Sequence, residues 1–299
     1  MILSVGEILV DMIGGEKDGT FFYERKAGGA PFNVACAAAK FGAESGFVGC
    51  VGDDTVGTFL EKFVNQQNLA YAYVKRNGEV NTTLAFVELD ASGERSFCFY
   101  RKNTADYRMP EVPDDLFDKA TIVHIGSLML SEKQGVNYAC DLAERAKKAG
   151  KLVSFDVNFR DDIFRDTQAA VAVYKQLIEK ADIVKFSEEE TEIFTQKYVD
   201  GLTDKLVCIS LGAQGSRWCY RGETGNVGSI KVSPVDTTGA GDAFYAGVLS
   251  QLDGISKADW QKTTLEQALR FGNVCGALNT LGRGAIDHLP DLETVKQYL

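Results

Sequence analysis

The chain has 299 residues, of which 45% are hydrophobic and 25% are charged, and its formal net charge is −10. These values are typical of a soluble globular protein that buries its own core, either as one large α/β domain or as two domains. The acidic balance argues against non-specific binding to nucleic acid or to anionic membranes, although local basic residues can still serve an anionic substrate.

The number and spacing of cysteines and histidines argue against several kinds of site. The seven cysteines are odd in number and include no C-x-x-C pair, so neither a disulfide framework nor a zinc site is indicated, and we expect reduced thiols. The two histidines, His124 and His288, are far apart, which argues against a Ser-His-Asp triad and against a histidine metal site. The N-terminus lacks a basic leader and no apolar run is as long as a membrane span, so we expect a cytoplasmic protein.

Short apolar runs alternate with amphipathic segments along most of the chain. Six runs have the length and composition of strands: 2–5, 47–51, 122–125, 152–155, 183–186 and 207–211. Three segments have helical patterns: 31–41, 135–149 and 169–180. Pro31 suits the first helical position of its segment, and Gly42 suits the residue just past its end. The alternation predicts βαβ units, a mainly parallel sheet covered on both faces, and ligand binding at the carboxyl ends of its strands.

One region interrupts this rhythm. Residues 82–89 and 95–101 are both strand-like, and the segment that joins them, Asp90–Glu94, has the composition of a turn. They predict an antiparallel hairpin, which with a partner near Thr20–Lys26 would form a small second sheet. The hairpin fits either a flap over a site or an ordinary peripheral element.

Side chains two apart in a strand point to the same face. Phe99 and Arg101 therefore share one face of the hairpin with Arg95 and Phe97. Aromatic rings and guanidinium groups on one face suit a cover over a polyol, because the rings can contact its carbons and the guanidinium groups its hydroxyls.

The run Asp236–Phe244 has the most informative chemistry. Gly239 and Gly241 stand before a helix-patterned segment, 243–252, so backbone N–H groups at a helix N-terminus are free to bind an anion. Asp242 adds a carboxylate in the same turn. Phosphoryl transfer to a hydroxyl needs both, because the amides stabilise charge on the moving group and the carboxylate accepts the proton. The simpler alternative is that Asp242 caps the helix.

Other nucleotide-binding signatures are absent from the sequence. There is no G-x-x-x-x-G-K-[ST] and no H-R-D with D-F-G, so neither a P-loop NTPase nor a protein kinase is indicated. The first strand leads into Gly6–Asp11 without the glycines of a dinucleotide fingerprint. Phe244 also stands where the third glycine would follow Gly239 and Gly241, which disfavours a dehydrogenase.

Several segments together resemble the ribokinase/PfkB carbohydrate-kinase family, and within it the bacterial fructokinases. The similar segments are Gly28–Asn33, Gly49–Asp54 with Gly57, and Asp236–Asp242, within matches that run from Gly6 to Pro290. The resemblance implies a three-layer α/β/α domain over residues 1–299 with a mainly parallel sheet. It also implies a small β-sheet lid, with strands within about 12–27 and 82–108.

The resemblance implies roles in catalysis and sugar binding. Asp242 corresponds to the catalytic base, and Gly239, Ala240 and Gly241 correspond to the anion hole. The residues that correspond to sugar contacts are Asp11, Gly28, Gly29, Asn33, Phe99, Arg101 and Arg160. A carboxylate and a carboxamide suit vicinal hydroxyls; their structural alternative is turn and cap chemistry.

The family resemblance also implies a nucleotide site and two cation sites. The residues that correspond to nucleotide contacts are Asn158, Lys185, Ser210, Gly212, Gly215, Asn273 and Gly276. Glu190 corresponds to the acidic residue of the family's N-x-x-E element, in which Ser187 here replaces Asn, and would orient waters on Mg²⁺. A monovalent cation, expected to be K⁺, maps to Asp236, Thr238, Asn279, Gly282 and Gly284. The sequence Leu281–Arg283 departs from the usual pattern of that loop.

The sequence thus predicts an ATP-dependent sugar kinase that phosphorylates a primary hydroxyl, with D-fructose as the first candidate substrate. Aminoimidazole riboside kinase, 2-keto-3-deoxygluconate kinase and ribokinase are alternatives within the family. A catalytically silent sugar-binding regulator is the alternative from another class, and the presence of Asp242 and Glu190 argues against it. The expected partners are the sugar and ATP, with no nucleic acid or membrane, and an exposed lid offers a surface for a homodimer.

Overall fold

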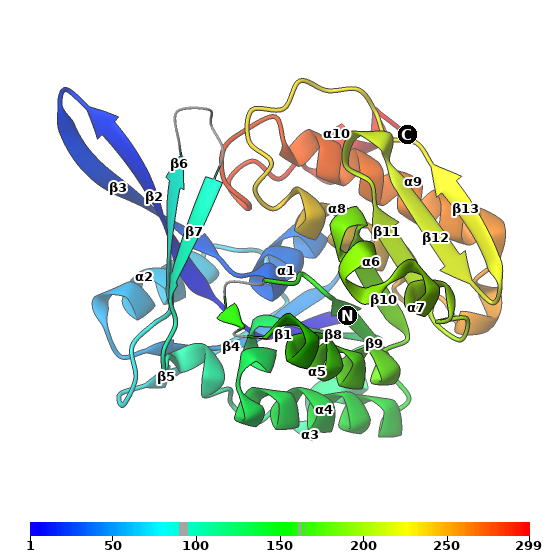
Figure 1. The fold of residues 1–299 in the computed structure, drawn as a ribbon, viewed down its shortest axis with the longest axis horizontal. Helices are drawn as coiled ribbons and strands as arrows, with labels where there is room; N and C mark the ends of the chain where they lie inside the picture. The colour runs from blue at the N-terminus through cyan, green and yellow to red at the C-terminus, as the bar shows by residue number, and fades with distance from the viewer. Residues whose placement is uncertain (90–94, 161–162, 165) are drawn as a thin grey trace.

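The computed structural model describes residues 1–299 apart from 90–94, 161–162 and 165, and apart from the side chains of 88–89 and 95–97. The strands are β1 (Ile2–Val5), β2 (Leu9–Lys17), β3 (Thr20–Gly28), β4 (Ser45–Gly52), β5 (Tyr71–Asn77), β6 (Leu84–Leu89), β7 (Arg95–Tyr100), β8 (Ile122–Ile125), β9 (Leu152–Asp156), β10 (Ile183–Ser187), β11 (Leu206–Ser210), β12 (Ser216–Tyr220) and β13 (Glu223–Val227). The α-helices are α1 (Ala30–Lys40), α2 (Thr55–Val64), α3 (Asp114–Lys119), α4 (Lys133–Lys148), α5 (Thr167–Lys180), α6 (Glu188–Phe194), α7 (Gln196–Asp200), α8 (Ala240–Leu252), α9 (Lys262–Asn279) and α10 (Leu292–Lys296) (Figure 1).

A nine-stranded sheet forms the centre of the molecule, in the order β13-β12-β11-β10-β9-β8-β1-β4-β5. Its strands from β11 to β5 are parallel, and β12 and β13 are antiparallel additions at one edge. The chain leaves β1 toward β4 and β5 and later returns to β8 on the other side. This reversal of strand order at β1 is where open α/β sheets bind ligands, beyond the carboxyl ends of the strands.

Helices cover both faces of this sheet, so the fold has the predicted three layers (Figure 1). One hydrophobic core packs α1, α8 and α9 against one face, and a second packs α3, α4 and α5 against the other. All six strands predicted from apolar runs are present, as β1, β4, β8, β9, β10 and β11, and the three helical segments correspond to α1, α4 and α5. The α/β class with a mainly parallel sheet is therefore confirmed.

Helix α8 is fixed to the sheet and to its neighbour by two different devices. Tyr245 is fully buried; its hydroxyl oxygen accepts a hydrogen bond from the Ser154 hydroxyl at 2.7 Å, and its hydroxyl donates to the backbone carbonyls of Phe155 and Ile183 in the sheet. On its other side, Gly247 faces Gly272 of α9 so closely that a Cβ on Gly247 would lie 2.8 Å from the Gly272 Cα. The start of α8 therefore has a fixed position above the sheet.

A separate four-stranded sheet, in the order β3-β2-β6-β7, projects from the main body (Figure 1). The predicted hairpin is present as antiparallel β6 and β7, and its turn, 90–94, lies outside the described residues. The segment 20–26 belongs to this sheet but is not the neighbour of the hairpin. The residue pattern did not indicate β2, of which the lid range 12–27 implied by the resemblance includes the part from residue 12 on. This strand pairs parallel with β6 and antiparallel with β3 and so lies between them.

Two further observations bear on the expectations from composition. Among the described residues, no helix has the length and apolar character needed to cross a membrane. All seven cysteines are free thiols, four of them buried.

Candidate active site

Two cavities lie beyond the carboxyl ends of the central strands. One has a volume of about 310 Å³ and is lined from β2, β7, α1 and the loop after β9. The other, of about 540 Å³, lies between the loop after β11, residues 229–234 and helices α8 and α9. Thr237 and Gly241 line both. The turn that begins α8 is therefore the wall between them.

The conformation of this turn requires glycine at its first position. Gly239 has φ +72°, in the left-handed region, and a Cβ there would lie 2.5 Å from the Ala285 Cβ. No side chain caps α8, and among the backbone N–H groups at its start that of Ala240 donates to the Thr237 carbonyl at 3.2 Å. The positive end of the helix dipole lies at the wall shared by the two cavities. The alternative that Asp242 caps this helix is thus excluded by the structure.

Asp242 lies in the first turn of α8 and points to the smaller cavity. Asn33 of α1 donates to its Oδ2 at 2.8 Å. Burial raises the pKa of Asp242 above its ordinary value, while the Asn33 hydrogen bond and the charges of Lys185 and Arg160 act in the opposite direction. A carboxylate with a raised pKa at a helix N-terminus is suited to accept a proton from a bound hydroxyl.

Most of the residues expected to contact sugar line the smaller cavity. Asp11, Gly29, Asn33, Phe99 and Arg160 are all in its wall. Gly28 is beside them, since a Cβ on it would collide with the Asp11 carboxylate.

Arg101 does not line this cavity, in contrast to the expectation that it contacts sugar there. Its side chain is buried at the base of the small sheet, where it forms an ion pair with Asp106 and donates to the Tyr107 hydroxyl at 2.6 Å and to Ser131 at 2.7 Å. Tyr100, at the end of β7, is 62% exposed. Strand alternation did describe its direction, since Arg101 is buried next to the exposed Tyr100, but its guanidinium group is bound by protein partners. The side chains of Arg95 and Phe97 lie outside the described ones.

Two residues expected at the nucleotide, Asn158 and Lys185, line the smaller cavity instead. The Lys185 ammonium group is buried between the two oxygens of Asp156, at 3.0 Å from each. It also faces the turn, because a Cβ on Gly241 would lie 3.3 Å from its Nζ. Lys185 therefore places a positive charge where the two cavities meet.

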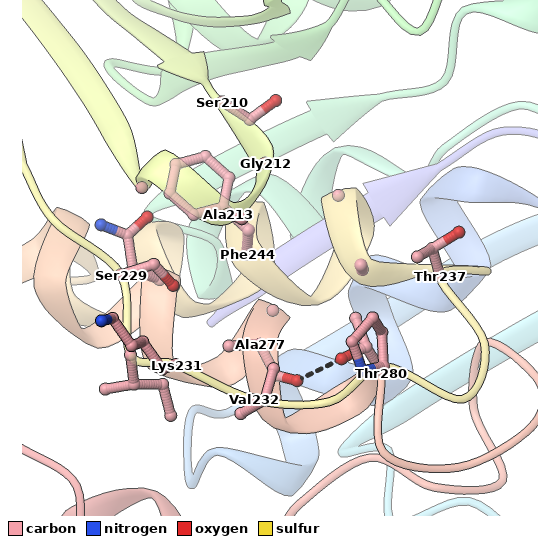
Figure 2. Close-up of a pocket in the computed structure, with 17 residues that line it drawn as sticks. Ser210, Gly212, Ala213, Ser229, Lys231, Val232, Thr237, Phe244, Ala277 and Thr280 are labelled. Atoms are coloured by element: carbon pink, nitrogen blue, oxygen red, sulfur yellow. Dashed lines mark hydrogen bonds between the residues drawn. The ribbon is translucent and has the colours of Figure 1, made fainter.

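The other five residues expected at the nucleotide line the larger cavity. These are Ser210, Gly212, Gly215, Asn273 and Gly276. Figure 2 shows this cavity between the loop after β11 and helix α9, with Phe244 in its wall and the Thr280 hydroxyl donating to the Ala277 carbonyl. Its lining is mostly apolar, as is usual for a site that holds a flat ring system.

Glu190 lines neither cavity. It is buried, whereas Glu188 and Glu189 beside it are exposed. Its Oε1 accepts the Phe159 N–H at 2.6 Å, and its Oε2 accepts the Ser187 N–H at 2.7 Å in a capping box. Within the described part of the chain, no three or more His, Cys, Asp or Glu side chains gather in a metal-binding group.

The loops expected to hold a monovalent cation are tied together. Asp236 accepts the Gly284 N–H at 2.9 Å and the Thr238 N–H at 2.7 Å, and Asn279 donates to the Thr238 carbonyl at 3.2 Å. Gly282 packs directly on the His288 ring. The Thr238 hydroxyl oxygen and Asn279 Oδ1 are buried, with no hydrogen-bond partner among the described residues. Two such oxygens, close to a carboxylate, suit a cation.

Sequence reasoning missed several residues of the two walls. In the smaller cavity these include Glu7 and Leu128, and in the larger one Lys231 and Phe244. The loop 229–234 has neither a motif nor a periodic pattern, so only the fold shows its place. Glu7 lies in the segment Gly6–Asp11, where a single glutamate between apolar residues matches no motif.

Comparison with known proteins gives one consistent result. The pfkB family of carbohydrate kinases matches residues 1–292. The chain belongs to this family. Fructokinase-1 of Oryza sativa subsp. japonica is 36% identical over 99% of this chain and 97% of its own length.

Solved structures agree with this membership. A fructokinase from Xylella fastidiosa with bound ATP superposes with a TM-score of 0.92 at 30% identity, over 99% of this chain and 97% of the other. A fructokinase double mutant from Vibrio cholerae O395, bound to fructose, ADP and potassium, has a TM-score of 0.88 at 30% identity, over 100% and 97% of the two chains. This pfkB protein is therefore an ATP-dependent sugar kinase with the ribokinase-like fold.

We predict that Asp242→Asn lowers kcat by about 10²-fold or more, because the amide cannot accept the proton of the attacking hydroxyl. In the wild type, kcat/KM should fall as pH decreases through a pKa above the ordinary aspartate range, since burial raises the pKa of Asp242. A steady-state assay over pH measures both. Asp259→Asn, at an exposed carboxylate outside both cavities, is the matched control. Near-full turnover of Asp242→Asn at saturation would show that another group is the base.

Proposed function

We propose that this pfkB protein is a fructokinase that transfers the γ-phosphoryl group of ATP to the primary 6-hydroxyl of D-fructose. The observation that carries the proposal is the shared wall, the turn from Thr237 to Asp242 between a polar cavity and a larger, mostly apolar one. Fructose in the first and ATP in the second would bring hydroxyl and γ-phosphate together at this turn. Fructose is proposed as the sugar because similar proteins are fructokinases, one of them solved with bound fructose.

The chemistry follows from this placement. Asp242 takes the proton from the sugar hydroxyl while the oxygen of that hydroxyl forms a bond to the γ-phosphorus. The bond between the γ-phosphorus and the bridging oxygen to the β-phosphate breaks, which releases ADP. The N–H groups at Gly239–Gly241 and the Lys185 ammonium stabilise the charge on the moving group. We infer that residues 1–299 act as one kinase domain, with the four-stranded sheet as its lid.

We also propose Mg²⁺ as the cation on the phosphates of ATP. Glu190 fits an indirect role, because its buried carboxylate already accepts two backbone N–H groups and retains lone pairs for a water. Mg²⁺ usually keeps several waters and binds through phosphates rather than in a cage of carboxylates.

We predict that D-fructose gives the highest kcat/KM in a coupled ADP-release assay over ketoses, aldoses, ribosides and sugar acids. A higher kcat/KM for another sugar would transfer the proposal to that sugar. Absence of ADP release with every sugar would favour the sugar-binding regulator.

We predict that the reaction requires Mg²⁺ and that Glu190→Gln shifts the Mg²⁺ titration of the rate to higher concentration, with little change in the KM for fructose.

We predict activation by K⁺. The buried oxygens of Thr238 and Asn279 lack partners among the described residues, and oxygen atoms of this kind replace the hydration shell of K⁺. A cation there would support the turn without contact with sugar, so K⁺ should raise kcat more than it changes the KM for fructose. Rates in K⁺ and in tetramethylammonium at equal ionic strength measure this. Equal rates would contradict a K⁺ site.

We further propose a homodimer through the outer face of the lid. Phe21, Tyr23, Phe86 and Tyr100 form a continuous chain of ring contacts across the sheet, at 5.0 to 5.4 Å between centroids. Phe21 is 59% exposed and Tyr100 62%, and exposed apolar patches of this kind mark interaction surfaces. A second copy of the chain has the same aromatic face, so the two faces could pack against each other in a symmetric dimer.

We predict a dimer for the wild type in light scattering at micromolar concentration, and a monomer for the double variant Phe21→Ser with Tyr100→Ser. Tyr298→Ser, at a 47% exposed residue near the C-terminus, should remain a dimer. A wild-type monomer, or a double variant that stays dimeric, would rule out this interface.

A further inference from the structure

Lys185 and Asp156 form an ion pair inside the central sheet. They are opposite each other in the parallel register of β10 and β9, near the carboxyl ends of both strands. The two side chains are 7% and 4% exposed, and the Lys185 Nζ lies 3.0 Å from each oxygen of Asp156. Because taking two charges out of water often costs more than their attraction returns, such a pair is weak evidence of a stabilising role. Departures of this kind from an apolar core are instead expected at functional sites.

The two members of the pair differ in what they can reach. Lys185 lines the smaller cavity and faces the start of α8, because a Cβ on Gly241 would lie 3.3 Å from its Nζ. Gly241 belongs to the wall that both cavities share, whereas Asp156 lines neither cavity. The ammonium group is therefore the member that meets a ligand at the α8 turn, and the carboxylate lies behind it.

The ammonium group keeps a donor for such a ligand. It has three N–H groups, and within the described part of the chain its hydrogen bonds are those to the two oxygens of Asp156. Burial lowers the pKa of Lys185, but nearby carboxylates raise it above the ordinary lysine value, and Asp156 makes the largest of these contributions. The others come from Glu190 and Asp242. Lys185 is thus charged at neutral pH, with at least one N–H left for another acceptor.

We propose that Asp156 is a positioning residue for phosphoryl transfer, whose carboxylate holds the Lys185 ammonium group against the α8 turn. The remaining N–H of Lys185 then donates to an oxygen of the transferred phosphoryl group. The inference rests on the proposed function, in which that group passes along this turn. It adds that the position and the charge of Lys185 depend on Asp156, although Asp156 itself contacts no substrate.

A double-mutant cycle of Asp156→Asn and Lys185→Met tests this dependence. Lys185→Met should lower kcat by about 10²-fold and Asp156→Asn by about tenfold or more, as for the loss or displacement of one preorganised donor to a developing charge. The KM for fructose should change little in both. The double variant should have the kcat of Lys185→Met alone, because Asp156 acts through Lys185. A further loss in the double variant overturns the inference, as does a wild-type kcat in a folded Asp156→Asn enzyme.

The alkaline side of the pH profile of kcat gives a readout that a purely structural pair would not change. In Asp156→Asn, burial still lowers the pKa of Lys185, while the largest charge that raises it is lost. The rate should therefore decline at a lower pH than in the wild type, as Lys185 loses its proton. A profile that coincides with that of the wild type contradicts the proposal.

Asp182→Asn is the matched control. Asp182 is also a buried aspartate paired with a lysine, with its Oδ1 2.8 Å from the Lys257 Nζ, but both residues lie outside the two cavities. Its replacement removes a comparable ion pair from the same sheet, so it can lower the melting temperature. Its kcat and its alkaline profile should nevertheless match those of the wild type.

Asp156→Asn leaves an ammonium group buried without its counter-charge, which can prevent folding. The other two variants contain no such group, since the carboxyl beside Met can take up a proton, and the comparison of their kcat values then decides alone. If the wild type prefers another sugar, the variants are measured with that sugar. A wild type that releases no ADP with any sugar contradicts the proposed function and the inference with it, whereas an active wild type with an additive cycle contradicts the inference alone.

Discussion

One hydrogen bond, from Asn33 to Asp242, joins segments 209 residues apart in the chain. It connects the first turn of α1 with the first turn of α8, so the carboxylate, the free amides of α8 and the sugar-side wall have one fixed arrangement. The rest of the fold supports this bond. Tyr245 anchors α8 to the sheet through Ser154, and the close approach of Gly29 to Glu7 sets the start of α1 against the end of β1. The hydrogen bond also partly offsets the burial that raises the pKa of Asp242.

Two cationic side chains, Lys185 and Arg160, oppose the carboxylates around this bond. Lys185 is paired with Asp156, and it lowers the pKa of Asp156, Glu190 and Asp242, each of which burial raises. Arg160 also lowers the pKa of Asp156 and Asp242, so three carboxylates share two cationic groups. Such a site suits a phosphate group that binds together with a metal cation. The two backbone N–H groups that donate to Glu190 further offset the cost of burying its carboxylate.

The central strands and the chemistry of the α8 turn could be predicted because local sequence determines them. Buried parallel strands are continuous apolar runs, and Gly239 and Asp242 lie close enough in sequence to predict an anion site with a carboxylate at one helix N-terminus. Other features depend on the fold. Strand β2 has two glycines, Gly14 and Gly15, over which aromatic rings of β3 pack, so its sequence lacks a strand pattern. Arg101 is buried next to the exposed Tyr100, as strand alternation predicts, but its partners Asp106 and Ser131 come from elements that sequence spacing could not place beside it.

Strands that line the smaller cavity also build the four-stranded sheet, and this limits how that sheet can move. Asp11 lies at the start of β2 and pairs in register with Lys26 near the end of β3. The base of the sheet is fixed by the buried network of Arg101 and Asp106, to which Thr83 donates at 2.5 Å. Toward its tip, β3 is exposed. If the sheet acts as the proposed lid, a closing motion would bend it above this base, with Asp11 and Glu7 as fixed parts of the cavity wall and Phe99 moving with the strands.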